Sequence, residues 1–243
     1  MKRIFAASFL VAVSSFIAFG QTPPRAEVLN DIETKRADLA KLETQFLSPS
    51  AEDRATYAEF LTQPNTGLIR LMPREKFDPE VNKNAVPTIR GGGAYYSFAR
   101  LTHEYGYGSD LELAGGDLSV GFYGACYGML IKLDGVRLED ISSGLPGVAF
   151  LAKYSAVTNE PDARVEQRRF QAGTVIDGAT YKMRVPVEVG ATYVLRSVSF
   201  DTSDVLVAFR VVRQDTDGSL IIAWRMLEKY PTPKLARNSQ VAN

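Results

Sequence analysis

Residues 192–228 read TYVLRSVSFDTSDVLVAFRVVRQDTDGSLIIAWRMLE, and this stretch decides the fold class of the chain. Three segments within it, 192–200, 205–213 and 220–228, are rich in Val, Ile, Leu, Phe and Tyr and are separated by polar turns. This composition and spacing predict three consecutive antiparallel strands. We therefore expect an α+β chain whose main part is an antiparallel β barrel or sandwich.

Alternation along the last two strands predicts which side chains share a face. One face is entirely apolar and is expected to be core: Val205, Val207, Phe209, Val211, Leu220, Ile222, Trp224 and Met226. The opposite face brings Arg210 and Arg225 together, directly opposite each other if Asp217 and Gly218 form a two-residue turn. Like charges there repel unless an acid, an anion or water separates them. The pair is a candidate anion-binding site, and the simpler alternative is a solvated face or pairing with local acids.

An aromatic, glycine-rich section over residues 94–127 suggests a ligand-binding site. Exposed tyrosines can stack on sugar rings or line an apolar cavity. The candidate ligand-binding residues are Tyr95, Tyr96, Tyr105, Tyr107 and Tyr123. The competing interpretation is that these side chains form the core, because aromatic residues also favour strands.

His103 is the only histidine and the only candidate for acid–base catalysis. One histidine excludes a multi-histidine zinc site but permits a general base in a secreted hydrolase. If residues 95–105 form one strand, His103 and Glu104 point to opposite faces. No G-x-S-x-G motif supplies a nucleophile, so a structural role for His103 is favoured.

The remaining motifs do not predict a metal or cofactor site. The glycine run at 90–93 lacks phosphate-loop spacing. The loop at 215–218 matches half of a calcium loop, but Arg213 and Trp224 stand where that loop needs acidic ligands. Cys126, the single cysteine, cannot form an internal disulfide and is expected to be a small buried hydrophobe.

Further strands are predicted between the aromatic section and residue 192. Asp134 and Gly135 suit a type I′ turn, which predicts a hairpin between strands near 117–133 and 136–141. Residues 148–154 are predicted to form another strand. The charged segment that follows, over residues 158–170, is expected to be a loop or a short helix.

The N-terminal part of the mature chain, residues 21–66, shows helical patterning. Val28, Ile32, Leu39, Leu42 and Phe46 recur at spacings that place them on one helical stripe. Ser48 is expected to cap a second helix, whose apolar side carries Tyr57, Phe60 and Leu61. We predict a helical hairpin that either packs on the β domain of residues 67–233 or acts as an interaction arm. Residues 234–243 are expected to be a solvated tail.

The first twenty residues, MKRIFAASFLVAVSSFIAFG, predict a secretory signal peptide. Lys2 and Arg3 precede an apolar run, and Ala18 and Gly20 supply small residues at positions −3 and −1 of a cleavage site. We therefore expect an exported protein, periplasmic or extracellular. The alternative is an uncleaved segment that tethers the chain to the membrane.

The charge balance bears on partners. Lys and Arg number 28, equal to Asp and Glu, and signal cleavage removes two cations. A nearly neutral chain has no electrostatic reason to bind nucleic acid or an anionic membrane. The sequence predicts an exported, non-catalytic β domain that binds a small ligand or an envelope partner. The alternatives are a secreted hydrolase that uses His103, and a structural or interaction protein of the cell envelope.

Overall fold

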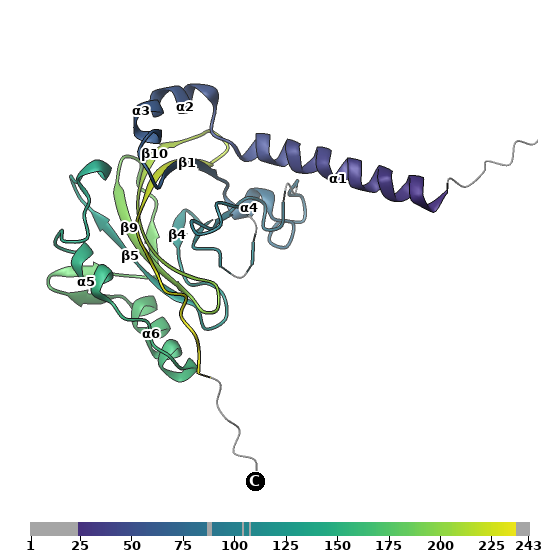
Figure 1. Cartoon of the computed structure of the whole chain (residues 1–243). Coiled ribbons are helices and arrows are strands. Elements are labelled where there is room, and N and C mark those ends of the chain that lie inside the picture. Colours follow the sequence, from purple (N-terminus) through teal and green to yellow (C-terminus); the bar gives the residue numbers. More distant parts are fainter. Residues whose placement is uncertain (1–23, 87–88, 104, 107, 237–243) are drawn as a thin grey trace, which may run out of the picture. The chain divides into compact units, whose positions relative to one another are not determined.

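The computed structural model describes residues 24–86, 89–103, 105–106 and 108–236 (Figure 1). The signal segment, Glu104, Tyr107 and most of the predicted tail lie outside the described residues. The described residues form mixed helices and antiparallel sheets, and they divide into two compact units between Lys41 and Leu42. Each unit is described separately.

The first unit contains most of helix α1 (Arg25–Leu47), which confirms the helix predicted from the apolar stripe. Lys35 and Asp31 form an ion pair of 2.7 Å, one turn apart along the helix. Much of the predicted stripe is exposed, with exposed fractions from 39% at Ile32 to 62% at Leu42.

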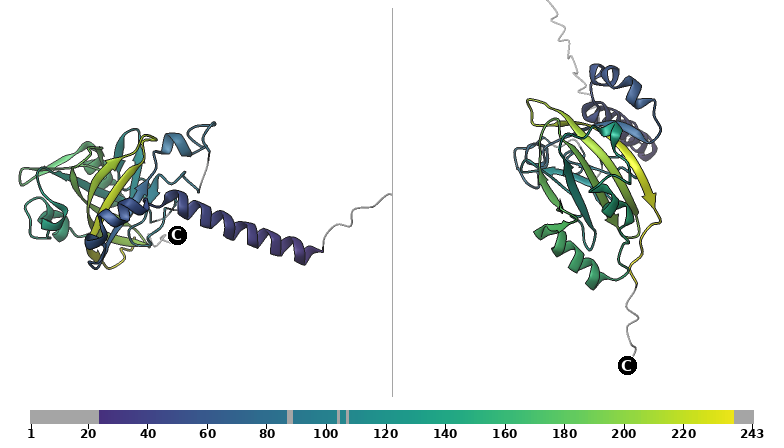
Figure 2. Two further views of the ribbon diagram at one scale, coloured as in Figure 1. Left: turned by 90° about the horizontal axis from the view of Figure 1, so that it is seen from above. Right: turned by 90° about the vertical axis from the view of Figure 1, so that its left-hand side faces the viewer.

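The second unit is built on a five-stranded antiparallel sheet. In spatial order its strands are β1 (Thr66–Leu71), β11 (Leu220–Tyr230), β10 (Ser203–Gln214), β9 (Thr192–Ser199) and β5 (Tyr127–Leu133). Strands β9, β10 and β11 pair consecutively, which confirms the meander. Two further views show the twist of this sheet (Figure 2).

A second sheet and a small hairpin complete the strands of the described residues. The second sheet contains β2 (Tyr95–Tyr96), β3 (Leu111–Ala114), β4 (Asp117–Ser119) and β8 (Arg184–Pro186), in that order, and the hairpin contains β6 (Thr174–Ile176) and β7 (Ala179–Tyr181). The sheets are open, so of the predicted barrel or sandwich the barrel is wrong.

The five-stranded sheet is buried on both faces. One face shares a core with the second sheet and contains the predicted apolar set of β10 and β11, from Val205 to Trp224, with Met226 at its margin. The alternative that the opposite face is solvated is wrong, because Leu206, Ala208 and Ile221 form a second core there. Helices cover this face, which the sequence did not predict, and Figure 1 shows α5 and α6 on that side of the sheet.

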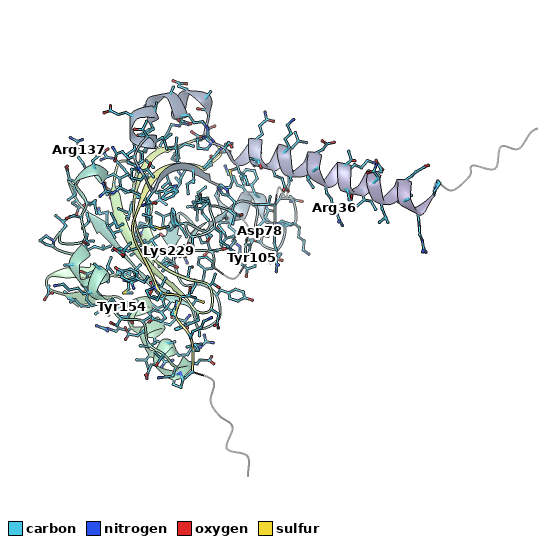
Figure 3. All side chains as sticks on the ribbon, in the orientation of Figure 1. Arg36, Asp78, Tyr105, Arg137, Tyr154 and Lys229 are labelled. Atoms are coloured by element: carbon cyan, nitrogen blue, oxygen red, sulfur yellow. The ribbon has the colours of Figure 1, made fainter. Side chains whose placement is uncertain are left out.

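The predicted strand at 148–154 is instead helix α5 (Val148–Lys153), and the charged segment after it forms α6 (Glu160–Ala172). Val148 and Leu151 are both fully buried, and their spacing of three residues suits one face of a helix. Asn159 caps α6 by accepting the backbone N–H of Asp162 at 2.9 Å. The Tyr154 hydroxyl donates to Glu166 at 2.8 Å and links the two helices; Figure 3 labels Tyr154.

The predicted hairpin at Asp134 and Gly135 is also wrong. The chain turns there with Gly135 at φ 69°, but β5 pairs with β9 instead of with the segment that follows the turn. That segment forms a short 3₁₀ helix, η1 (Leu138–Asp140). Leu138 and Ile141 are buried in the helix-covered core, so tertiary packing overrides the local hairpin preference.

The predicted second helix of the hairpin is broken into α2 (Ala51–Thr56) and α3 (Ala58–Leu61). Its cap is Ser50 and not Ser48, because Asp53 lies three residues after Ser50 and completes a reciprocal capping box. Phe60 is buried in the core under β1, so this part of the hairpin packs on the sheet. Helix α4 (Arg74–Phe77) follows β1.

Candidate functional site

Two adjoining depressions lie beside the end of β5 and the loop between β8 and β9. Their volumes are about 590 Å³ and 400 Å³, within the range of small-molecule sites. They share Leu133, Asp134, Val136 and Glu188 as lining residues. Among the described residues, no aromatic side chain lines either depression, so sugar stacking is not supported at this place.

The Lys132 side chain in the larger depression is already paired with two acids. The Lys132 ammonium lies 2.9 Å from Asp134 and 2.8 Å from Glu188. Hydrogen bonds to these two acids raise the pKa of Lys132, and the bond to Glu188 has the larger effect. A ligand that used this lysine would have to displace an existing ion pair.

Arg210 is the cation that remains available beside the smaller depression. Its side chain is half-buried and lines the cavity. Within the described residues, the Arg210 guanidinium has no hydrogen bond or ion pair. An anionic group in this cavity could therefore use Arg210 without displacing a protein carboxylate.

The predicted pairing of Arg210 with Arg225 is offset. Arg225 lies opposite Ala208, and Arg210 lies opposite Ala223, because a register shift between Val211 and Arg213 moves the strands relative to a simple two-residue turn. The two arginines share a face as diagonal neighbours. The Arg225 guanidinium donates to the carbonyl of Ile141, so the two groups do not converge on one depression.

Tyr95 and Tyr105 are brought together, although not in either depression. Tyr95 is buried and donates its hydroxyl to Glu112 at 2.7 Å. Its ring centroid lies 4.6 Å from that of Tyr105 and 5.1 Å from that of Phe122 (Figure 3 labels Tyr105). Burial and the adjacent Glu112 carboxylate raise the pKa of Tyr95.

The other candidate tyrosines lie apart from this cluster. Tyr96 is buried in the core between the sheets, and its ring packs edge-on against His103 with centroids 4.9 Å apart. Tyr123 is exposed, and Tyr107 lies outside the described residues. The five tyrosines therefore do not form one binding surface among the described residues.

His103 is held in a structural position. Its Nε2 lies 2.8 Å from the carbonyl oxygen of Arg70, so this nitrogen carries a proton and donates. Burial lowers the pKa of His103, which favours the neutral ring. The predicted strand over 95–105 is wrong, because β2 ends at Tyr96 and the chain turns back through Leu101, whose φ is 57°.

Sequence reasoning missed a fully buried carboxyl, Asp110. Its Oδ2 accepts the backbone N–H of Phe98 at 2.8 Å, and hydroxyl groups of Ser97 and Ser197 also contact the carboxyl group. The other oxygen, Oδ1, has no hydrogen-bond partner. Burial raises the pKa of Asp110 to about 6. The local sequence, Gly-Ser-Asp, is typical of an exposed turn and gave no signal of this burial.

A buried ion pair was also missed, although the sequence contains its signal. Arg196 stands in the middle of an apolar strand and is 1% exposed. Its guanidinium binds the Asp204 carboxylate through both oxygens, donates to the Leu151 carbonyl at 2.7 Å and stacks on the Tyr230 ring. A charge in a strand buried on both faces requires such a partner.

Other chemistry finds little support in the described part of the chain. No group of three or more His, Cys, Asp or Glu residues there could hold a metal ion. Cys126 is buried, as predicted, and burial raises the pKa of its thiol. None of the described helices combines the length and apolar character needed to cross a membrane.

Comparisons with known proteins place this chain in no group. No protein-family model, curated protein or solved structure matches it.

Proposed function

We propose that this chain is an exported, non-catalytic interaction protein of the cell envelope. In this proposal the second unit is a folded scaffold and helix α1 is the element that contacts a partner. The N-terminal segment of residues 1–20 supports export through its sequence pattern alone.

The exposed stripe of α1 carries this proposal. Val28, Ile32, Leu39 and Leu42 have exposed fractions of 40%, 39%, 55% and 62%. Fully burying a side chain of this kind contributes about 1.5–3 kcal/mol relative to leaving it in water. Most of the stability of a helix in a protein comes from the packing of its apolar face, so a partner that covered the stripe would also stabilise α1.

The contacts of the candidate catalytic groups support a non-catalytic role. The His103 Nε2 is occupied by the Arg70 carbonyl, and Cys126 is buried with a raised pKa. A general base or a reactive thiol needs an accessible atom with a pKa suited to its task. The hydrolase alternative is therefore less well supported than the interaction role.

A matched pair of variants tests the proposed function. Leu39→Asp places a charge on the stripe, whereas Ala37→Asp places the same charge on an outward-facing position with a similar loss of helix propensity. We expect size-exclusion chromatography of the envelope fraction under native conditions to give complexes of the same size for wild type and Ala37→Asp. The Leu39→Asp variant should elute as a smaller species. Equal sizes for all three forms would contradict a role for the stripe.

Arg210 favours a second candidate function, the binding of a small anionic ligand in the 400 Å³ depression. We expect calorimetric titration with inorganic phosphate or citrate to show saturable binding that Arg210→Gln weakens at least tenfold, because the guanidinium is the main available cation there. Arg168→Gln, an exposed change on α6, is the control and should bind normally. Absence of binding, or equal binding by both variants, would exclude this site for these anions.

A further inference from the structure

The exposed stripe of α1, together with Lys35, which lies on the same helical face, has the spacing of a coiled coil. Val28, Ile32, Lys35, Leu39 and Leu42 follow one another at intervals of four, three, four and three residues. This is the a/d pattern of two heptads, with Ile32 and Leu39 at a and the other three at d. We propose that two copies of the chain associate through α1 as a parallel, in-register coiled coil, an inference that rests on the proposed role of α1.

The charges beside the stripe are complementary to those of a second helix of the same sequence. In a parallel pair, the g residue of one helix faces the e residue five positions later in the other helix. Asp31 at g then faces Arg36 at e of the second copy, with opposite charge, and this pair occurs twice by symmetry. Figure 3 labels Arg36 on α1.

An antiparallel pair is disfavoured by the same charges. In that orientation g faces g and e faces e, so the alignment with the longest overlap places Asp38 against Asp38 and Arg36 against Arg36. Like charges at such positions destabilise association and select against this orientation. The parallel pair has unfavourable contacts of its own. Asp38 faces Glu43 of the second copy, a contact that occurs twice by symmetry, and the two Lys35 side chains meet in one d layer.

Lys35 fixes the register. It is the only charged side chain in the stripe, and it carries its own counter-ion, because Asp31 of the same helix lies 2.7 Å away. The in-register arrangement places the two Lys35–Asp31 pairs in one layer. A shift of one heptad would place Lys35 against Val28 or Leu42, which would bury its charge among apolar groups.

The length of the stripe sets the strength of the interaction. Four apolar layers and one lysine layer make a short coiled coil, and the cost of association offsets much of the gain from burial. We therefore expect a reversible equilibrium between monomer and dimer that depends on concentration.

Sedimentation equilibrium of the purified mature chain tests this inference. We expect wild type and Ala37→Asp to dimerise with rising concentration and Leu39→Asp to stay monomeric. Asp38→Lys should tighten the dimer roughly fivefold to tenfold, because it converts two repulsive contacts with Glu43 into attractive ones. Glu33→Lys makes the same charge change at an outward b position and should leave the dimer unchanged.

Cysteine pairing tests the orientation. Leu42→Cys should form a disulfide between copies under mild oxidation, because equivalent d residues face each other only in the parallel pair. Ala37→Cys should not form one. Circular dichroism of each variant should show that the second unit remains folded, so that loss of association is not loss of structure.

Two results would overturn the inference: a chain that is monomeric at every concentration, or a dimer that Leu39→Asp and Asp38→Lys leave unchanged. Failure of self-association is distinguishable from failure of the proposed function. A monomeric purified chain whose envelope complex still shrinks with Leu39→Asp has a different partner. A chain that shows neither effect contradicts both proposals.

Discussion

Replacing Arg196 with methionine is expected to lower the free energy of unfolding by about 3–5 kcal/mol. The Asp204 carboxylate is 3% exposed, and without the guanidinium it would remain as a buried charge with no partner. The Leu151 carbonyl would also lose its donor. Urea denaturation at neutral pH measures the effect.

The double variant Arg196→Met, Asp204→Leu is the matched control. It removes both charges, and apolar residues of similar volume can replace a buried ion pair at little cost. We expect it to recover most of the stability that the single variant loses. A single variant within about 1 kcal/mol of wild type would show that the pair is not buried as described.

The second large effect is a dependence of stability on pH that Asp110 causes. Its pKa is raised from 3.8 to about 6 in the folded chain, so the folded state holds this proton more tightly than the unfolded state. The stability contributed by the protonated carboxyl is fully present below about pH 4. It is lost as the pH rises to about 6, by about 3 kcal/mol in total.

Asp110→Asn removes this titration while its amide oxygen can still accept the Phe98 N–H. The stability of the variant relative to wild type should therefore rise by about 3 kcal/mol between pH 4 and pH 7. Denaturation curves across that range measure it, and Glu80→Gln, an exposed change, is the control. A constant difference between the Asp110 variant and wild type would show that Asp110 does not titrate in this range.

The fold could be predicted where local pattern and tertiary packing agree. Strands β9 to β11 were found because their apolar residues form long runs and one face of β10 and β11 alternates cleanly. The strand prediction for residues 148–154 is wrong because Val148 and Leu151 are apolar at a spacing that a short helix and a short strand both allow. The turn at Gly135 was recognised, but burial of Leu138 decided what followed it.

The candidate site residues were harder to predict, because their roles depend on contacts between distant segments. His103 is separated in sequence from the Arg70 carbonyl that fixes it. Arg210 and Arg225 were placed on one face correctly, but the register shift before Arg213 cannot be read from composition. The stripe of α1 was visible in the sequence, and only the structure showed that it is exposed while Phe60 of the following helices is buried.

Site-specific photo-crosslinking in the producing cells tests most directly whether α1 is the interaction element. A photo-reactive residue at position 39 lies on the stripe, and the same residue at position 37 lies on the outer face. The proposed function predicts one discrete adduct from position 39 and none from position 37, and an adduct of twice the chain mass would identify a second copy. No adduct from position 39, or equal adducts from both positions, would contradict it.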